Sequence, residues 1–63
     1  MVWVAVDENG FEYIFDVLNR PYRYQGRWKV KYTHETYIPL PKGSIKKLIG
    51  RELTWDDEPV EIS

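Results

Sequence analysis

The sequence predicts a small, mainly β domain of the α+β type: an antiparallel meander of four or five curled strands with one short helix near residues 44–50. Short segments of β-branched and aromatic residues alternate with polar residues at period two, and turn residues separate them. Only one segment has helical spacing. Of the 63 residues, 43% are hydrophobic and 16% aromatic, which is typical of a folded chain. We expect residues 1–63 to form one domain, whose curled sheet could be barrel-like.

The first predicted element is a β-hairpin at the N-terminus. Asp7 and Gly10 occupy the first and fourth positions of a turn, and alternating residues follow. Two registers are open. A three-residue loop ending in a left-handed Gly10 places Trp3 on the same face as Phe15, whereas a two-residue loop places Val4 there. A slip of one residue exchanges the two faces, and the turn residues favour the three-residue loop.

A second hairpin is predicted around a Gln25-Gly26 turn. Aromatic and basic positions alternate on both sides of this turn, so the aromatic side chains can face a core while the bases face water. The predicted inward residues are Tyr22, Tyr24, Trp28, Val30 and Tyr32, and the predicted outward residues are Arg23, Arg27, Lys29 and Lys31.

The second half of the chain predicts an edge strand and then a short helix. Pro39 and Pro41 lie two apart in an extended segment, so their missing N–H groups point to the same side, which a central strand does not tolerate. Ser44 is a suitable N-cap, and Gly50 ends the helix after fewer than two turns. Because so short a helix is unstable alone, its apolar face must lie on the sheet.

One or two short strands are expected to complete the chain after an acidic turn at residues 56–58. The predicted core is Val4 or its register alternatives, Phe15, Trp28, Val30, Ile38, Leu40, Ile45, Leu48, Ile49, Leu53, Trp55 and Val60.

Charges are sorted into three blocks. Residues 1–18 carry four acids and no base, residues 19–51 carry all nine bases and one acid, and residues 52–63 carry five acids. Glu12 and Asp16 occupy outward positions, where a neighbouring strand bearing the bases of the second hairpin would pair with them. We weigh this strand-pairing explanation above a nucleic-acid surface. The alternation separates stacking aromatics from bases, and the net charge is only −1.

Few residues could support catalysis. His34 is the only histidine, and His34-Glu35 lacks the second histidine that an HExxH metal site needs. The chain has no cysteine, and three consecutive carboxylates at 56–58 point in different directions rather than around one cation. We therefore expect no enzyme, no cofactor and no metal site, with a general base at His34 as a minor alternative.

Several segments together resemble a group of known sequences. They are Trp3 to Asp7 with Gly10, Ile38 to Ile45, Lys47 to Arg51, Leu53 to Trp55 and Asp57 to Val60. In these segments the chain resembles short uncharacterised proteins encoded by phages and prophages of gut anaerobic bacteria. The resemblance spans most of the chain and is least close from Arg20 to Tyr37. It implies a small accessory protein acting in the cytoplasm of a bacterial host, and it implies no particular activity.

The expected function is a non-enzymatic protein-interaction module that binds a host or phage protein or forms a homodimer. The alternative is binding of single-stranded nucleic acid or RNA through the basic-aromatic hairpin 20–37. No run approaches the roughly 18 apolar residues of a membrane span, so no membrane partner is expected. The candidate contact residues are Arg20, Tyr22, Arg23, Tyr24, Arg27, Trp28, Lys29 and Lys31. A secondary basic patch is expected at Lys46 and Lys47. Positive charge is expected to remain unneutralised at Arg20, Arg23, Lys46 and Lys47.

Overall fold

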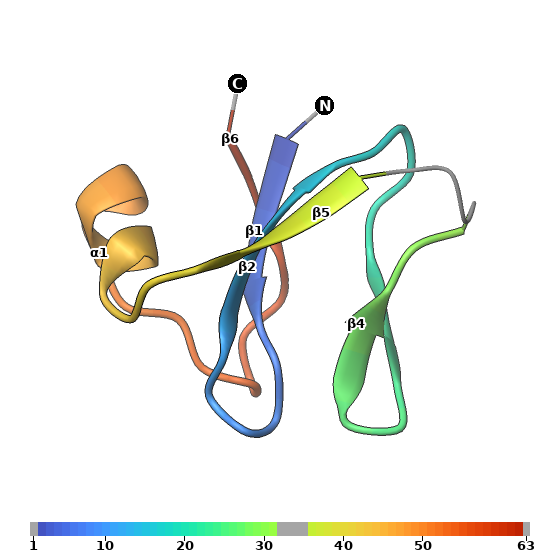
Figure 1. Cartoon of the computed structure of the whole chain (residues 1–63), viewed down its shortest axis with the longest axis horizontal. Coiled ribbons are helices and arrows are strands. Elements are labelled where there is room, and N and C mark those ends of the chain that lie inside the picture. Colours follow the sequence, from blue (N-terminus) through green and yellow to red (C-terminus); the bar gives the residue numbers. More distant parts are fainter. Residues whose placement is uncertain (1, 32–35, 63) are drawn as a thin grey trace.

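The computed structural model describes residues 2–31 and 36–62 as two antiparallel sheets and one short helix (Figure 1). The larger sheet has the order β5-β2-β1-β6 and comprises β1 (Val2–Val6), β2 (Glu12–Asp16), β5 (Thr36–Leu40) and β6 (Val60–Ile62). The smaller sheet pairs β3 (Tyr22–Tyr24) with β4 (Arg27–Lys29), and the helix is α1 (Ser44–Ile49). The mainly β class with one short helix is confirmed. The described strands do not close into a barrel, because β5 and β6 remain the two edges of an open sheet.

The first hairpin adopts the three-residue loop. The backbone nitrogen of Asp7 donates to the carbonyl of Phe11 at 2.9 Å, and the nitrogen of Gly10 donates to the carbonyl of Asp7 at 2.9 Å. Gly10 has a φ of 90°, a left-handed conformation that costs glycine little. Trp3 pairs with Phe15 across the ladder, which confirms the favoured register.

The four-stranded sheet has a different layer on each face. On one face Val4 packs with Ile45 of α1, and on the other Ala5 packs with Trp28 of β4. Period-two alternation along β1 sends these neighbours to opposite sides. Figure 1 shows the result, with α1 on one side of the sheet and the β3–β4 hairpin on the other. The second hairpin therefore lies on the sheet as a separate layer and does not extend it as a further strand of a meander.

Most predicted core residues are buried or half-buried, but two are wrong. Ile38 is 54% exposed and Leu48 is 51% exposed. α1 packs over β1, whereas Ile38 lies on β5, two strands away. Ile45 and Ile49, four positions apart, direct one helical face onto the sheet, and Leu48 falls on its flank. Val4 and its register alternative Ala5 are both buried, because both faces of the sheet are covered, and the prediction did not include the buried Val6 and Val17.

Two predictions about chain ends and edges are confirmed. The proline-containing strand β5 pairs with β2 and with no other described strand, so it lies at an edge of the sheet. The helix ends at Gly50, whose φ is 82° and whose nitrogen donates to the carbonyl of Lys46 at 2.8 Å.

The predicted N-cap of the helix is wrong. The hydroxyl of Ser44 donates to the carbonyl of Pro41 at 2.6 Å, and Gly43 takes the N-cap position. The carboxylate of Glu12 accepts hydrogen bonds from the nitrogens of Gly43, at 2.7 Å, and Ile45, at 2.9 Å. A strand residue thus supplies the acceptor that a local cap would otherwise supply.

Candidate functional site

The second hairpin is fixed to the first by three backbone-directed hydrogen bonds. The carbonyl of Gly26 accepts from the nitrogen of Glu8 at 3.0 Å. The backbone nitrogen of Trp28 donates to Oδ1 of buried Asp7 at 3.0 Å, and its indole Nε1 donates to the carbonyl of Val6 at 2.7 Å. One face of the hairpin is therefore directed at the sheet and the other at solvent.

The register of this hairpin corrects the predicted division between inward and outward residues. Tyr22 pairs with Lys29, Arg23 with Trp28, and Tyr24 with Arg27. Residues directly opposite each other share a face of the ladder. Alternation holds along each strand, but the two-residue turn sets the even-numbered tyrosines opposite odd-numbered bases. The tyrosines predicted to be inward point outward, and Arg23, predicted to be outward, lies beside Trp28.

The solvent-facing side of the hairpin, hereafter the outer face, consists of Tyr22, Tyr24, Arg27 and Lys29. Tyr22 is 49% exposed and Tyr24 is 52% exposed, and both bases are exposed. Within the described part of the chain, neither tyrosine ring pairs with another aromatic ring and neither base forms an ion pair. The outer face therefore offers free ring surfaces beside unneutralised cations.

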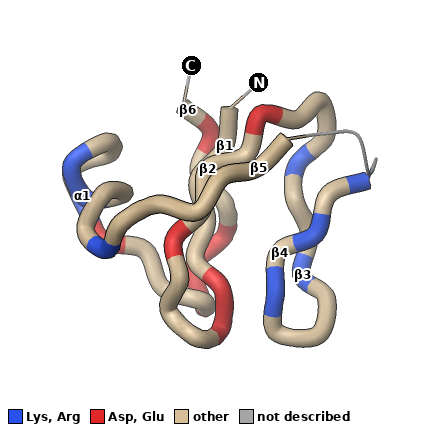
Figure 2. The backbone as a smooth tube through the Cα atoms, viewed as in Figure 1, with Lys and Arg blue, Asp and Glu red and all other residues tan. Residues whose placement is uncertain are grey.

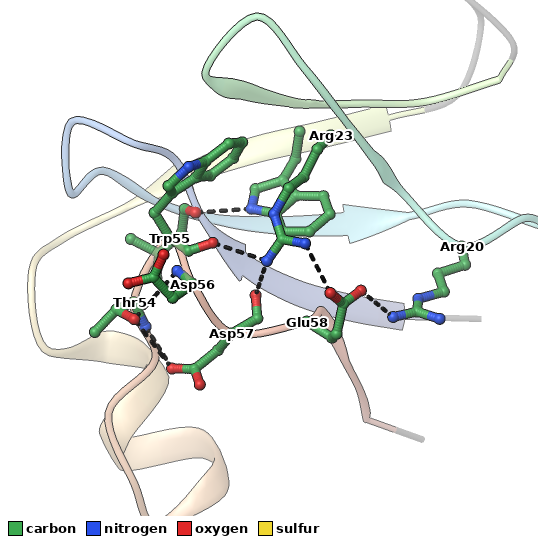
Figure 3. A network of polar contacts seen from close by, with 9 residues as sticks. Arg20, Arg23, Thr54, Trp55, Asp56, Asp57 and Glu58 are labelled. Carbon is green, nitrogen blue, oxygen red and sulfur yellow. Dashed lines mark hydrogen bonds and ion pairs between the residues drawn. The ribbon is translucent and has the colours of Figure 1, made fainter.

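The sheet-facing side, hereafter the inner face, is centred on Arg23 (Figure 3). Its guanidinium carbon lies 4.7 Å from the ring centroid of Trp28 and 5.2 Å from that of Trp55. The two indoles meet edge to face, with centroids 5.4 Å apart. Nη2 of Arg23 also donates to the carbonyls of Trp55, at 2.9 Å, and Asp57, at 3.2 Å. This arginine joins the hairpin to the C-terminal loop.

The C-terminal loop that receives Arg23 is shaped by its own turn. The nitrogen of Thr54 donates to Oδ2 of Asp57 at 2.8 Å, and the nitrogen of Asp57 donates to the carbonyl of Thr54 at 3.0 Å. These bonds direct backbone carbonyls and the Glu58 side chain toward the hairpin (Figure 3). The acidic turn predicted from sequence is therefore a receptor for arginine.

Glu58 forms ion pairs with both Arg20 and Arg23, the two arginines that were expected to remain unneutralised. Nη1 of Arg23 donates to Oε2 of Glu58 at 2.7 Å, and Arg20 pairs with Oε1. The prediction that Glu12 and Asp16 neutralise the bases of the second hairpin is wrong. Their strand, β2, has β1 and β5 as neighbours, so β4 never comes beside it.

The secondary basic patch is separate from the hairpin. Lys46 and Lys47 are exposed on α1, on the opposite face of the sheet. Figure 2 shows bases at the two ends of the molecule and acids along the middle. A hollow of about 570 Å³ beside α1 is lined by Lys42 and Lys46, and its acidic lining residues are Asp7, Glu8, Glu12, Glu52 and Asp56. The helix bases therefore do not continue the outer face of the hairpin.

Some predicted site residues fall elsewhere. Lys31 is exposed beyond the end of β4. Tyr32, His34 and Glu35 lie outside the described residues, and so does the minor prediction of a general base at His34. In the ranges 2–31 and 36–62, no group of three or more histidine, cysteine or acidic side chains is arranged to hold a metal ion. No helix in the same ranges is long and apolar enough to cross a bilayer.

Sequence reasoning missed Glu58 and Trp55 as partners of the hairpin. Both lie more than 30 positions beyond Arg23, as the separations of 35 and 32 along the chain show. The available signal was compositional, because the basic middle block needed acidic partners and the C-terminal block was the richer source. Alternation along a strand carries no information about such distant contacts.

Comparison of the chain with protein-family models, with curated proteins and with solved structures gives no match. The resemblance to phage and prophage proteins stays a prediction. Function is therefore inferred from the chemistry of the described residues. Exposed aromatic rings stack on bases or anchor protein interfaces, and adjacent cations meet phosphate or carboxylate groups.

Proposed function

We propose that the protein binds single-stranded nucleic acid through the outer face of the β3–β4 hairpin. The observation that carries the proposal is the pairing of exposed Tyr22 with Lys29 and of exposed Tyr24 with Arg27 on one face. Single-strand binding surfaces combine aromatic rings, on which bases stack, with cations that follow the phosphate backbone. Each ring here lies opposite one cation, so that one pair suits one nucleotide, with the base on the ring and the phosphate at the cation.

The spacing of the tyrosines favours a single strand over a duplex. Tyr22 and Tyr24 are two residues apart in one strand, so their rings project from points about 7 Å apart on the same face. Bases that are splayed from an extended strand can stack on two such rings in succession. In a duplex the bases are already stacked on each other, and their faces are inaccessible to protein rings.

The charge on this site is small, and it sets the expected salt dependence. Arg27 and Lys29 are the two bases of the outer face, and each phosphate neutralised on a single strand contributes about −0.7 to the slope of log affinity against log salt. We expect a slope of about −1.4. The net charge of −1 provides no general attraction for a polyanion, so binding depends on this face.

The test of the tyrosines is fluorescence anisotropy with a short labelled oligouridylate at low ionic strength. The double substitution Tyr22→Ala, Tyr24→Ala should weaken binding by at least about 25-fold, because each stacked base contributes about 1–3 kcal/mol. The matched double substitution Tyr22→Phe, Tyr24→Phe keeps both rings and should retain most of the affinity. Loss of binding in both double variants would contradict stacking as the role of these two tyrosines.

The test of the cations compares two charge-matched double variants. Arg27→Ala with Lys29→Ala should weaken binding and flatten the salt dependence, because both bases lie on the outer face. Lys46→Ala with Lys47→Ala removes the same charge from the opposite side of the sheet and should change affinity little. Equal losses in the two variants, or no binding by the wild-type protein at low ionic strength, would contradict the proposal.

A second candidate function is protein binding, the role that the sequence favoured, with a host or phage protein or a second copy as partner. Exposed tyrosine beside arginine is a common interface anchor, and Ile38 and Leu48 add exposed apolar surface elsewhere. Capture from bacterial lysate after nuclease treatment tests this role, using wild-type protein and the Tyr22→Ala, Tyr24→Ala variant in parallel. A protein retained by the wild type and lost by the variant supports protein binding, and a protein whose capture is abolished by the nuclease treatment opposes it.

Sedimentation equilibrium tests the homodimer, which predicts twice the monomer mass.

A further inference from the structure

Arg20 and Arg23 surround a single carboxylate at the edge of the β3–β4 hairpin. Each guanidinium contacts a different oxygen of Glu58, Oε1 for Arg20 and Oε2 for Arg23 (Figure 3). Two cations thus share one anion, and the cluster keeps an excess positive charge. Arginine pairs arranged in this way suit a group with more oxygens and more charge than a carboxylate.

Arg23 is held in position without the help of Glu58. Its guanidinium lies against the rings of Trp28 and Trp55, and Nη2 donates to two backbone carbonyls, those of Trp55 and Asp57. Only Nη1 is directed at Glu58, at 2.7 Å. If Glu58 moved away, this arginine would keep its place and present Nη1 to another acceptor. A binding group fixed in advance loses little entropy when a ligand arrives.

Glu58 is a replaceable partner. Its side chain is 59% exposed and that of Arg20 is 51% exposed, and ion pairs so open to water are weak. A cavity of about 310 Å³ adjoins the cluster and gives an incoming group room. It is lined by Arg20, Pro21, Tyr22, Arg23, Trp28 and Glu58. Tyr22 is also part of the outer face, so the cavity and the proposed stacking surface meet at this residue.

We propose that Arg20 and Arg23 form a binding site for the terminal phosphate of a single strand, which replaces the Glu58 carboxylate while the adjoining base stacks on Tyr22. This inference rests on the proposed function. An internal phosphodiester carries one charge, as Glu58 does, so exchanging the two gains little. A terminal phosphate monoester carries close to two charges at neutral pH and has three acceptor oxygens. Only the terminal group gains contacts over the carboxylate that it displaces.

The test compares three oligouridylates of one length, with a 5′-phosphate, a 3′-phosphate or hydroxyls at both ends. The wild-type protein should bind one of the phosphorylated strands about tenfold more tightly than the hydroxyl strand, which corresponds to the gain of a charged hydrogen bond. Arg20→Ala should remove this preference. Glu58→Gln should increase the affinity for that phosphorylated strand several-fold, because it removes the competing charge. Glu61→Gln is the matched control, since it removes the same charge from β6, and it should leave the preference unchanged.

Failure of this inference is distinguishable from failure of the proposed function. If all three strands bind equally well to the wild-type protein and Glu58→Gln has no effect, the terminal-phosphate site is wrong while single-strand binding stands. If no strand binds to the wild type or to Glu58→Gln, the proposed function itself fails. Inorganic phosphate and a phosphoserine peptide serve as competitors. If either competitor displaces the labelled phosphorylated strand as effectively as the unlabelled phosphorylated strand does, the site recognises a phosphate group in general and not the end of a strand.

Discussion

The two faces of the β3–β4 hairpin are built from similar residues, and they are placed in opposite situations. On the inner face, Arg23 contacts two indoles, two carbonyls and a carboxylate. On the outer face, Arg27 lies opposite Tyr24 and has no ion-pair partner among the described residues. Arg23 is held in place by these contacts with the protein, whereas Arg27 leaves its hydrogen-bonding groups to water or to a ligand.

The difference shows that the partners of a residue decide its role more than its chemical type does. Trp28 is 7% exposed and fixes the hairpin to β1, whereas Tyr24 is 52% exposed and its ring pairs with no aromatic ring among the described residues. Substitutions on the inner face should therefore lower stability, whereas substitutions on the outer face should change binding and leave stability nearly unchanged.

The largest expected effect is that of Trp28→Ala. Removing this side chain leaves a cavity and deletes the bond from Nε1 to the carbonyl of Val6, and such changes cost about 3–5 kcal/mol. A 63-residue domain at about 0.05–0.15 kcal/mol per residue has a stability of about 3–9 kcal/mol, so the variant should lose at least about a third of it and melt at a much lower temperature by circular dichroism. Tyr24→Ala should stay within about 0.5 kcal/mol of the wild type.

Trp28→Phe separates packing from hydrogen bonding at the same position. It keeps an aromatic ring but loses the Nε1 donor, so it should remain folded with a loss of about 1–2 kcal/mol. If Trp28→Ala and Tyr24→Ala melted at the same temperature, the inner face would not be the structural one.

An intermediate effect is expected when the two arginines are compared. Arg23→Ala removes two carbonyl bonds, an ion pair and the contacts with both indoles, and should cost about 1–2 kcal/mol after allowance for a partly exposed guanidinium. Arg27→Ala should cost less than about 0.5 kcal/mol. Urea unfolding followed by tryptophan fluorescence measures both. Arg23→Lys keeps the charge but not the planar fork, and should fall between them. Equal losses for the two alanine variants would show that their different surroundings carry no energetic weight.

Local signals in the sequence were sufficient for the first hairpin, the edge strand and the end of the helix. Asp7 and Gly10 define a turn whose geometry fixes the register of β1 and β2. Pro39 can only be accommodated at an edge, and Gly50 can adopt a positive φ. Each of these outcomes depends on interactions within a few residues, and such interactions can be predicted from a pattern.

The site was predicted incorrectly for two reasons, a misassigned face in the second hairpin and contacts between distant parts of the chain. The pairing of Tyr24 with Arg27 is local, and it was missed because alternation was continued unchanged through the turn, whereas two turn residues place the tyrosines of β3 on the same face as the bases of β4. Glu58 lies 35 positions beyond Arg23, and α1 and the C-terminal loop separate the two residues along the chain. Glu12, at the start of β2 and more than 30 positions before the helix, replaces Ser44 as the acceptor at the helix N-terminus. None of these partners is marked by periodicity.

The smallest expected effect concerns Gln25, which lies in the turn that both faces share. Gln25 has a φ of 50° and Gly26 a φ of 77°, the positive values of a type I′ turn, in which asparagine precedes glycine most favourably. Gln25→Asn should therefore raise the melting temperature by about 2 °C, which corresponds to a few tenths of a kcal/mol. Its affinity for a single strand should not change, because the side chain belongs to neither face. Gln25→Val is the control, because a β-branched residue is strained at positive φ and should lower the melting temperature. A lower melting temperature for the asparagine variant would mean that this turn does not set the register on which the separation of the two faces depends.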